Sequence, residues 1–266
     1  MRILAAIGMV LALAAGPVHA GEFEDGLKYY EGKDYANAIK AWSSAAAKGS
    51  VPAQFTLGYV YEKGEGVTQD YKEALSWYQK AAVLGYAAAQ INLGSMYEKG
   101  QGILPDIKQA VSWYEKAAAQ GLVEAEFNMG RMYQTGQGVA QDYQQAASWY
   151  QKAGARGHTW AQSALGLMYE TGQGVAVDHK QALSWYQKAA EQGDLMAQFD
   201  LGRIYEAGPE GVPTDTVEAH KWWSIAAAGG EDRARRGLRV VERSMKPEQI
   251  AEAKKRAELW QKAHSK

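Results

Sequence analysis

The chain has 266 residues, with 29 Lys/Arg, 30 Asp/Glu and no cysteine. A formal net charge of −1 gives no overall attraction to nucleic acid or to an anionic surface. The absence of cysteine excludes disulfides, thiolate metal sites and cysteine nucleophiles, so packing alone must hold the fold together.

Residues 1–20 have the pattern of a secretory signal peptide. Arg2 precedes an apolar stretch over residues 3–15, and the small-residue sequence VHA ends at Ala20. This stretch is shorter than the about 20 residues that a membrane-spanning helix needs, and no other segment is apolar for long enough. We therefore expect cleavage after Ala20, no transmembrane span, and an exported protein that stays in the periplasm or is secreted.

Residues 21–50 share the pattern of the second half of a repeat that follows them. Asp34, Ala38 and Trp42 align with positions that recur later in the chain at a spacing close to 36 residues. We expect an N-terminal half repeat that caps the array.

Five repeats follow, each marked by a tryptophan. The tryptophans recur at steps of 36, 36, 36 and 37 residues: Trp77, Trp113, Trp149, Trp185 and Trp222. Ala53, Leu57 and Tyr61 predict a first helix in each repeat by their i, i+4, i+8 spacing, and Ala74 with Tyr78 predicts a second. One such pair cannot bury its own apolar face, so the repeats must stack. The sequence predicts an all-α solenoid of helix-turn-helix units at residues 51–86, 87–122, 123–158, 159–194 and 195–230.

The loop inside each repeat contains two closely spaced glycines, in three of the repeats as Gly-x-Gly-Val, which raises the question of a phosphate-binding loop. In the first repeat Gly64 and Gly66 are followed by Asp70, with Glu73 three residues later. This is the pattern of a capping box, in which the aspartate carboxylate occupies the positive end of the helix where a phosphate would sit. The same pairing recurs in every repeat: Asp70/Glu73, Asp106/Gln109, Asp142/Gln145, Asp178/Gln181 and Asp215/Glu218. We therefore expect the loop to turn the chain and bind no nucleotide.

Residues 231–266 lose the repeat signature and are expected to form degenerate capping helices. A last helix is predicted from Pro247, with Ala253, Ala257 and Trp260 facing the final repeat. This tail carries 11 Lys/Arg and 6 Asp/Glu. It is either a surface for an anion or the solvated end of the helical array.

The 36-residue pattern resembles the Sel-one-like repeat (SLR) family, a relative of the tetratricopeptide repeats. The resemblance rests on the Leu-Gly pair, the tyrosine, Gly-x-Gly-Val, the aspartate, Trp-Tyr and Ala-Ala, and it extends over about residues 22–264. It implies a right-handed α–α superhelix whose concave surface, lined by first helices, binds other proteins. It also implies a bacterial envelope protein. Some cysteine-rich relatives are linked to β-lactam binding, but this chain lacks both the cysteines and a Ser-x-x-Lys motif.

Positions on the first helices opposite the buried stripe are the candidate binding residues. They are chosen because they vary within a strict repeat and include aromatic and arginine anchors. The candidates are Tyr59, Arg131, Trp160, Leu167, Arg203, Phe55, Phe127 and Phe199. For the phenylalanine positions, packing between adjacent first helices is the alternative; for the others, it is ordinary solvent exposure.

Three other groups of residues are candidates for a functional role. Glu62 and Glu98 recur at one position and are candidates for a glycosidase-like pair, but nothing nearby distinguishes one carboxyl from the other. The histidines pair with no carboxylate at ligand spacing, so no metal and no cofactor is predicted. A row of lysines (Lys80, Lys116, Lys152 and Lys188) serves either solubility or contact with an anionic glycan or lipid.

The sequence predicts a non-enzymatic scaffold that binds a protein or peptide partner and no nucleic acid. The alternatives are a peptidoglycan-binding module of the cell wall, or an enzyme acting on cell-wall material or β-lactams.

Overall fold

The computed structural model describes residues 20–264. Residues 1–19, nearly all of the predicted signal peptide, lie outside the described residues, as do residues 265–266. Residues 20–264 form fourteen α-helices and one short 3-10 helix, and no strand. Within the same range, no helix combines the length and apolar composition that a bilayer crossing requires. The prediction of an all-α stack of helix pairs is confirmed.

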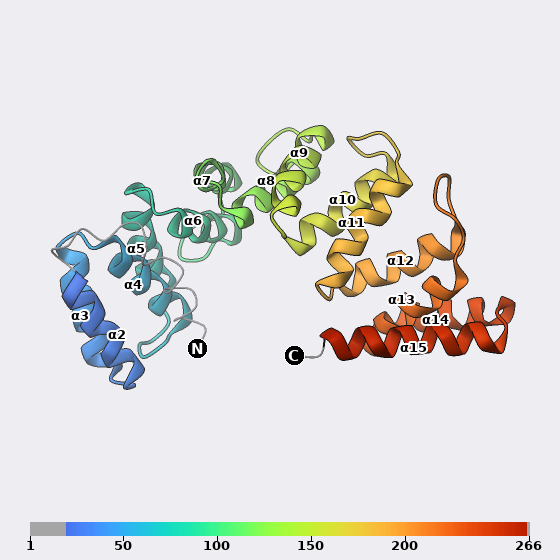
Figure 1. The fold of residues 1–266 in the computed structure, drawn as a ribbon. Coiled ribbons are helices and arrows are strands. Elements are labelled where there is room, and N and C mark those ends of the chain that lie inside the picture. Colours follow the sequence, from blue (N-terminus) through green and yellow to red (C-terminus); the bar gives the residue numbers. More distant parts are fainter. Residues whose placement is uncertain (1–19, 265–266) are drawn as a thin grey trace. The chain divides into compact units, whose positions relative to one another are not determined.

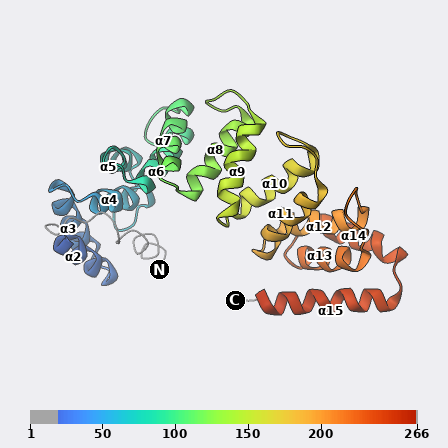
Figure 2. The same cartoon turned by 45° about the horizontal axis from the view of Figure 1, so that its top comes forward.

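The chain divides into two compact units, and along the sequence the division falls within α8 (Val123–Thr135). In the first unit consecutive helices pack side by side (Figure 1): α2 (Ala20–Glu31), α3 (Tyr35–Ala47), α4 (Val51–Lys63), α5 (Tyr71–Val83), α6 (Ala87–Lys99) and α7 (Ile107–Ala119). The second unit contains the repeats from α9 onward and the C-terminal helices (Figure 2): α9 (Tyr143–Ala155), α10 (Thr159–Thr171), α11 (His179–Glu191), α12 (Leu195–Ala207), α13 (Thr216–Ala228), α14 (Asp232–Val241), the 3-10 helix η1 (Glu242–Ser244) and α15 (Pro247–His264).

The aspartate before each second helix is its N-cap, as predicted. Asp70 Oδ1 accepts hydrogen bonds from the backbone N–H groups of Lys72 and Glu73, at 2.8 and 3.1 Å. Asp178 does the same for Lys180 and Gln181, at 3.0 Å each. The carboxylates therefore occupy the helix N-termini in the structure.

A capping box also includes a bond from the Glu or Gln side chain back to the backbone N–H of the aspartate, and this part of the prediction is wrong. The backbone N–H of Asp70 donates to the carbonyl of Tyr61 at 3.0 Å, and that of Asp178 donates to Tyr169 at 2.9 Å. These N–H groups are already satisfied by the end of the first helix, so they need nothing from Glu73 or its equivalents. The same bond fixes how the two helices of a repeat are joined.

The two loop glycines have different tasks. Gly64, Gly100 and Gly172 end their helices in the left-handed region, with φ of 69–73°. The second glycine lies against the preceding repeat: a Cβ on Gly102 would come within 2.6 Å of the Tyr71 carbonyl carbon. The loop is therefore also a contact between repeats, which is why the glycines recur.

The glycine of each Leu-Gly pair provides the surface on which the aromatic ring of the second helix lies. A Cβ on Gly58 would lie 2.6 Å from the Tyr78 ring, and one on Gly166 would lie 2.6 Å from Tyr186. Tyr78 is fully buried and Tyr186 is 1% exposed. Glycine is required here for close approach, because the helical backbone itself does not need it.

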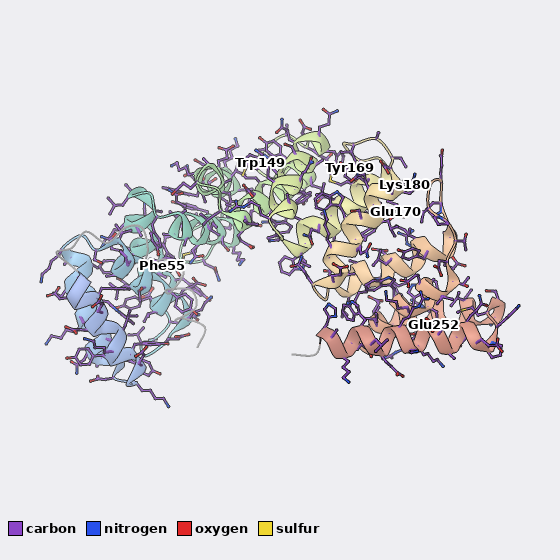
Figure 3. The ribbon with its side chains drawn as sticks, in the orientation of Figure 1. Phe55, Trp149, Tyr169, Glu170, Lys180 and Glu252 are labelled. Carbon is purple, nitrogen blue, oxygen red and sulfur yellow. The ribbon has the colours of Figure 1, made fainter. Side chains whose placement is uncertain are left out.

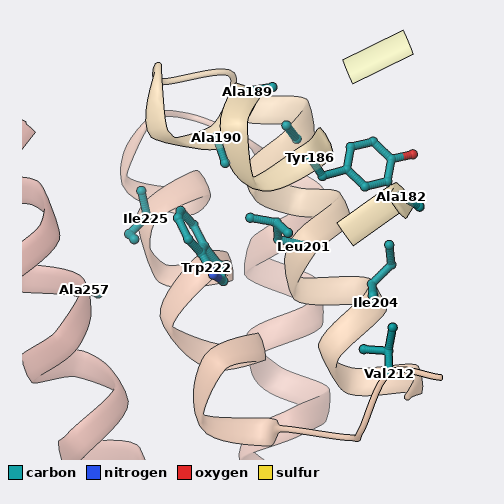
Figure 4. Close-up of a cluster of buried hydrophobic side chains, with 11 residues drawn as sticks. Ala182, Tyr186, Ala189, Ala190, Leu201, Ile204, Val212, Trp222, Ile225 and Ala257 are labelled. Carbon is teal, nitrogen blue, oxygen red and sulfur yellow. The ribbon is translucent and has the colours of Figure 1, made fainter. Parts of the chain in front are cut away.

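The C-terminal helices cover the last repeat. Leu201, Ile204 and Trp222 lie between α12 and α13 in one buried cluster, which Ala257 of α15 completes (Figure 4). Ala253 is also buried. The predicted start of the last helix at Pro247 and its inward face are confirmed.

Candidate interaction surface

The recurring carboxylates are bound by tyrosines of the same repeat. The hydroxyl of Tyr78 donates to Glu62 at 2.8 Å, that of Tyr114 to Glu98 at 2.8 Å, and that of Tyr186 to Glu170 at 3.0 Å. Where Gln134 replaces the glutamate, Tyr150 donates to its side-chain oxygen at 2.7 Å. Burial raises the pKa of Tyr150 to about 12, against a smaller opposing effect of Arg131, so this hydroxyl remains a donor at neutral pH. The glutamate row thus has a structural task, to satisfy buried tyrosine hydroxyls.

Arg203 is held in an ion pair between two repeats. Its guanidinium binds both carboxylate oxygens of Glu170 at 2.6 Å, and its Nε lies 3.3 Å from Asp200. Burial alone would raise the pKa of Glu170, but the hydrogen bond and charge of Arg203 outweigh burial and hold this pKa below its ordinary value. Burial raises the pKa of Asp200, with Arg203 opposing it. Glu170 lies at the end of α10 (Figure 3).

The three predicted phenylalanines are partly or wholly packed. Phe55 is 7% exposed, with its ring centroid 5.6 Å from that of Tyr78 and 5.0 Å from that of Tyr86 (Figure 3). Phe199 is half-buried, and the guanidinium carbon of Arg233 lies 4.4 Å from its ring centroid. Phe127 is also half-buried. For Phe55 this is the arrangement that the packing alternative describes.

Tyr59 and Arg131 are half-buried side chains on first helices. The ammonium of Lys63 lies 5.7 Å from the ring centroid of Tyr59. Tyr59 also packs against the cores on both sides of α4. Much of its ring therefore serves packing.

Trp160 and Leu167 differ from the other candidates because they face solvent. Trp160 is 63% exposed and Leu167 44%, both on α10. On α12, Met196 is 49% exposed and Leu195 37%. Trp160 and Leu195 line one hollow of about 550 Å³, together with Gln192 and Asp194. We call Trp160, Leu167, Leu195 and Met196 the apolar surface of α10 and α12.

Leu195 was not among the predicted site residues. It also lines a second hollow of about 810 Å³, whose far side is formed by Trp260 and His264 of α15. The repeat offers one signal for it, since its equivalents Val51, Ala87, Val123 and Thr159 are all smaller. Sequence alone could not show that α15 forms a wall beside it.

The lysine row lies over the repeat tryptophans. The ammonium groups of Lys80, Lys116, Lys152 and Lys188 are 3.7, 3.8, 4.0 and 3.9 Å from the ring centroids of the tryptophans three residues earlier. These are cation–π contacts. In the first four repeats the row therefore has a structural role, covering the tryptophan ring, that neither of the predicted alternatives included.

The histidines lie apart from one another. His158 Nδ1 accepts from the Ala161 N–H at 3.2 Å and so caps α10, while buried His220 lies 2.9 Å from Glu242. Among residues 20–264, no three His, Asp or Glu side chains gather as metal ligands would.

The fold is that of a helical repeat protein, in which each repeat contributes one first helix and one second helix to a solenoid. The model of the Sel1 repeat matches residues 51–86, 87–122, 123–158, 161–194 and 195–231. The chain belongs to the Sel1 repeat family.

Two solved structures are similar to it over most of its length. One is the protective antigen c5321 of uropathogenic Escherichia coli, with 32% identity and a TM-score of 0.82 over 90% of this chain and 53% of that one. The chain thus spans about half the length of the antigen. The other is a Sel1 repeat protein from Oxalobacter formigenes, with 35% identity and a TM-score of 0.73 over 91% of this chain and 100% of that one. Among curated proteins, none matches.

Proteins of this family are in general repeat scaffolds that mediate protein interactions.

Proposed function

We propose that this chain is an exported, non-enzymatic scaffold whose partner, a protein or peptide, binds the apolar surface of α10 and α12. One observation carries the proposal: Trp160 is 63% exposed in an array whose other aromatic side chains mostly pack into cores or between repeats. Exposed tryptophan with adjacent aliphatic groups is typical of the anchors that dominate binding energy.

The other candidate residues are less favourable because they already make contacts within the protein. Arg203 is engaged by Glu170 and Phe55 is buried, so a partner would have to displace existing contacts to use either. Trp160 and Leu167 lie seven residues apart, which places them on one face of α10. Leu195 and Met196 extend that apolar character onto the next first helix.

The test is site-specific photocrosslinking in living cells from positions 160 and 167. Leu104 and Val177 serve as matched controls, because they are 84% and 57% exposed apolar residues on inter-helix loops. We expect a stoichiometric protein adduct from 160 and 167 only. With the purified partner, Trp160→Ala is expected to weaken binding by about 30-fold or more. Adducts from all four positions, or from the loops alone, would show that the surface is wrong.

Export is part of the proposal and rests on residues 1–20. The description of the E. coli protein as a protective antigen supports it, because a protective antigen is met by the host's immune system. Val10→Arg, which places a charge in the apolar stretch, is expected to retain the precursor in the cytoplasm. Mass spectrometry of the wild-type protein should show a mature N-terminus at Gly21. Sedimentation with purified peptidoglycan, in the absence of any stoichiometric protein partner, would favour the wall-binding alternative instead.

A further inference from the structure

One face of α14 and the 3-10 helix after it carries a cluster of exposed arginines. Arg235, Arg236, Arg239 and Arg243 are all exposed, and Val240 among them is 56% exposed. At 3.6 residues per turn, the members within α14 lie in an arc of about 140°. The opposite side of α14 is buried through Ala234 and Val241. We call these four arginines and Val240 the arginine face.

Two other arginines of the tail, Arg233 and Arg256, are paired with acidic neighbours. Arg233 pairs with Glu231 at 2.8 Å, and Arg256 pairs with Glu218 at 2.9 Å and with Glu252 at 2.8 Å. These bonds attach the basic tail to itself and to the acidic last repeat.

The arginine face is largely uncompensated. Arg235 alone has a partner, Asp232 at 2.8 Å, and both of these side chains are more than half exposed. For Arg236, Arg239 and Arg243, no carboxylate among residues 20–264 lies within ion-pair distance. Three guanidinium groups thus face solvent without an ion-pair partner, and of these Arg236 alone is near enough to Glu231 for its charge to help Arg233 lower the pKa of that carboxyl.

The residue types on this face indicate what it binds. The exposed basic residues of the repeats are mostly lysines, with Arg156 an exception, whereas α14 contains four arginines and no lysine. Guanidinium groups bind phosphate in a bidentate manner and are more weakly hydrated than ammonium groups. An exposed valine among the arginines adds a group that gains from leaving water at a lipid interface.

We propose that the arginine face binds the phosphate headgroups of an anionic lipid bilayer, with Val240 entering the interfacial layer. Nucleic acid shares the phosphate chemistry, but α14 has no aromatic side chain on which a base could stack. The proposal is independent of the partner surface on α10 and α12.

The test is co-sedimentation of the full chain with vesicles of phosphatidylcholine and phosphatidylglycerol at about 3:1, against vesicles of phosphatidylcholine alone. Arg236→Gln/Arg239→Gln/Arg243→Gln is compared with a control, Lys40→Gln/Lys72→Gln/Lys108→Gln, which removes the same charge from exposed lysines elsewhere. All variants share residues 1–20, so any membrane affinity of that segment is common to them. Circular dichroism melting checks that each variant is folded.

We expect the arginine variant to bind the anionic vesicles about 100-fold more weakly, at about five-fold for each arginine, and the lysine variant to bind like the wild type. Val240→Ser is expected to weaken vesicle binding and leave binding to duplex DNA unchanged. Equal losses in both triple variants, or no preference of the wild type for anionic vesicles, would overturn the proposal. Duplex DNA binding as tight as vesicle binding, together with no effect of Val240→Ser, would assign the face to a soluble polyanion instead.

Discussion

Gly166→Ala separates packing from helix propensity in this fold. Alanine is the better helix former by about 1 kcal/mol, so propensity alone predicts that the variant is more stable. In the structure, however, the new Cβ would lie 2.6 Å from the ring of Tyr186, which is 1% exposed and donates to Glu170 at 3.0 Å. Carbon atoms pack at about 3.5–4.0 Å, so the ring must move by about 1 Å.

The size of the effect follows from these contacts. Overpacking costs about 1–3 kcal/mol, and a lost hydrogen bond to a carboxylate costs about 1.5–3 kcal/mol. Subtracting the propensity gain, we expect Gly166→Ala to lower the free energy of unfolding by about 1.5–5 kcal/mol in urea denaturation followed by circular dichroism.

Gly154 in α9 provides the matched control. A Cβ there would meet its nearest neighbours, side-chain atoms of Leu165, Gln162 and Trp185, at 3.3–3.4 Å, so Gly154→Ala should change stability by no more than about 1 kcal/mol. In a Tyr186→Leu background the cost of Gly166→Ala should shrink, because the ring it strikes is gone. Equal effects of the two alanines, or a stabilised Gly166→Ala, would refute the packing argument.

Three further predictions concern the caps, the lysine row and the inter-repeat ion pair. Asp178→Ala, which removes two hydrogen bonds to the N-terminus of α11, should lower the unfolding free energy by about 1 kcal/mol, and Asp178→Asn should restore most of it. Lys188→Met should cost about 0.5–1 kcal/mol through the lost cation–π contact, and no cost in a Trp185→Leu background would be expected. Because the pKa of Glu170 is lowered in the fold, its contribution to stability is present above its unfolded pKa and is lost as pH falls through the folded value. The stability difference between wild type and Glu170→Gln should therefore shrink as pH falls from about 6 to about 3, and a difference independent of pH would contradict the assignment.

The repeat pattern predicted a first and a second helix in each repeat, for a physical reason. Each helix is bounded by a strong local signal, an aspartate at the start of the second helix and a left-handed glycine at the end of the first. Local signals can be read from sequence because their partners are a few residues away. Contacts between the two helices of a repeat were harder to predict from the sequence. The Leu-Gly pair was visible as a motif, but the tyrosine ring that packs on its glycine belongs to a residue 20 positions further along the chain.

The candidate site was predictable only in part, because one position serves different purposes in different repeats. Tyr59, Leu167 and Arg203 occupy equivalent positions, yet Tyr59 packs, Leu167 faces solvent and Arg203 binds Glu170. Variation within a repeat marks where the packing does not dictate a residue. Sequence variation does not show whether the side chain at such a position is already bound by a neighbouring side chain, as Arg203 is by Glu170.

The first and last helix pairs of the described repeat array differ from the inner repeats at the position of the buried tyrosine. Inner repeats bury a tyrosine whose hydroxyl reaches a glutamate or glutamine, whereas the pairs α2–α3 and α12–α13 bury Trp42 and Trp223 at the equivalent position. Each indole N–H donates instead to a first-helix carbonyl, Trp42 to Phe23 at 3.3 Å and Trp223 to Phe199 at 3.0 Å.

The larger ring fills space that a tyrosine would leave open. Trp223 lies against Gly202 on one side and against Gly237 of α14 on the other, where a Cβ would come within 2.7 Å of the indole. With the indole bonded to the backbone, Glu206 has no buried hydroxyl to accept from and is exposed. The exchange of tyrosine for tryptophan thus alters three positions together, and the new glycine contact is made by a capping helix that has no repeat signature.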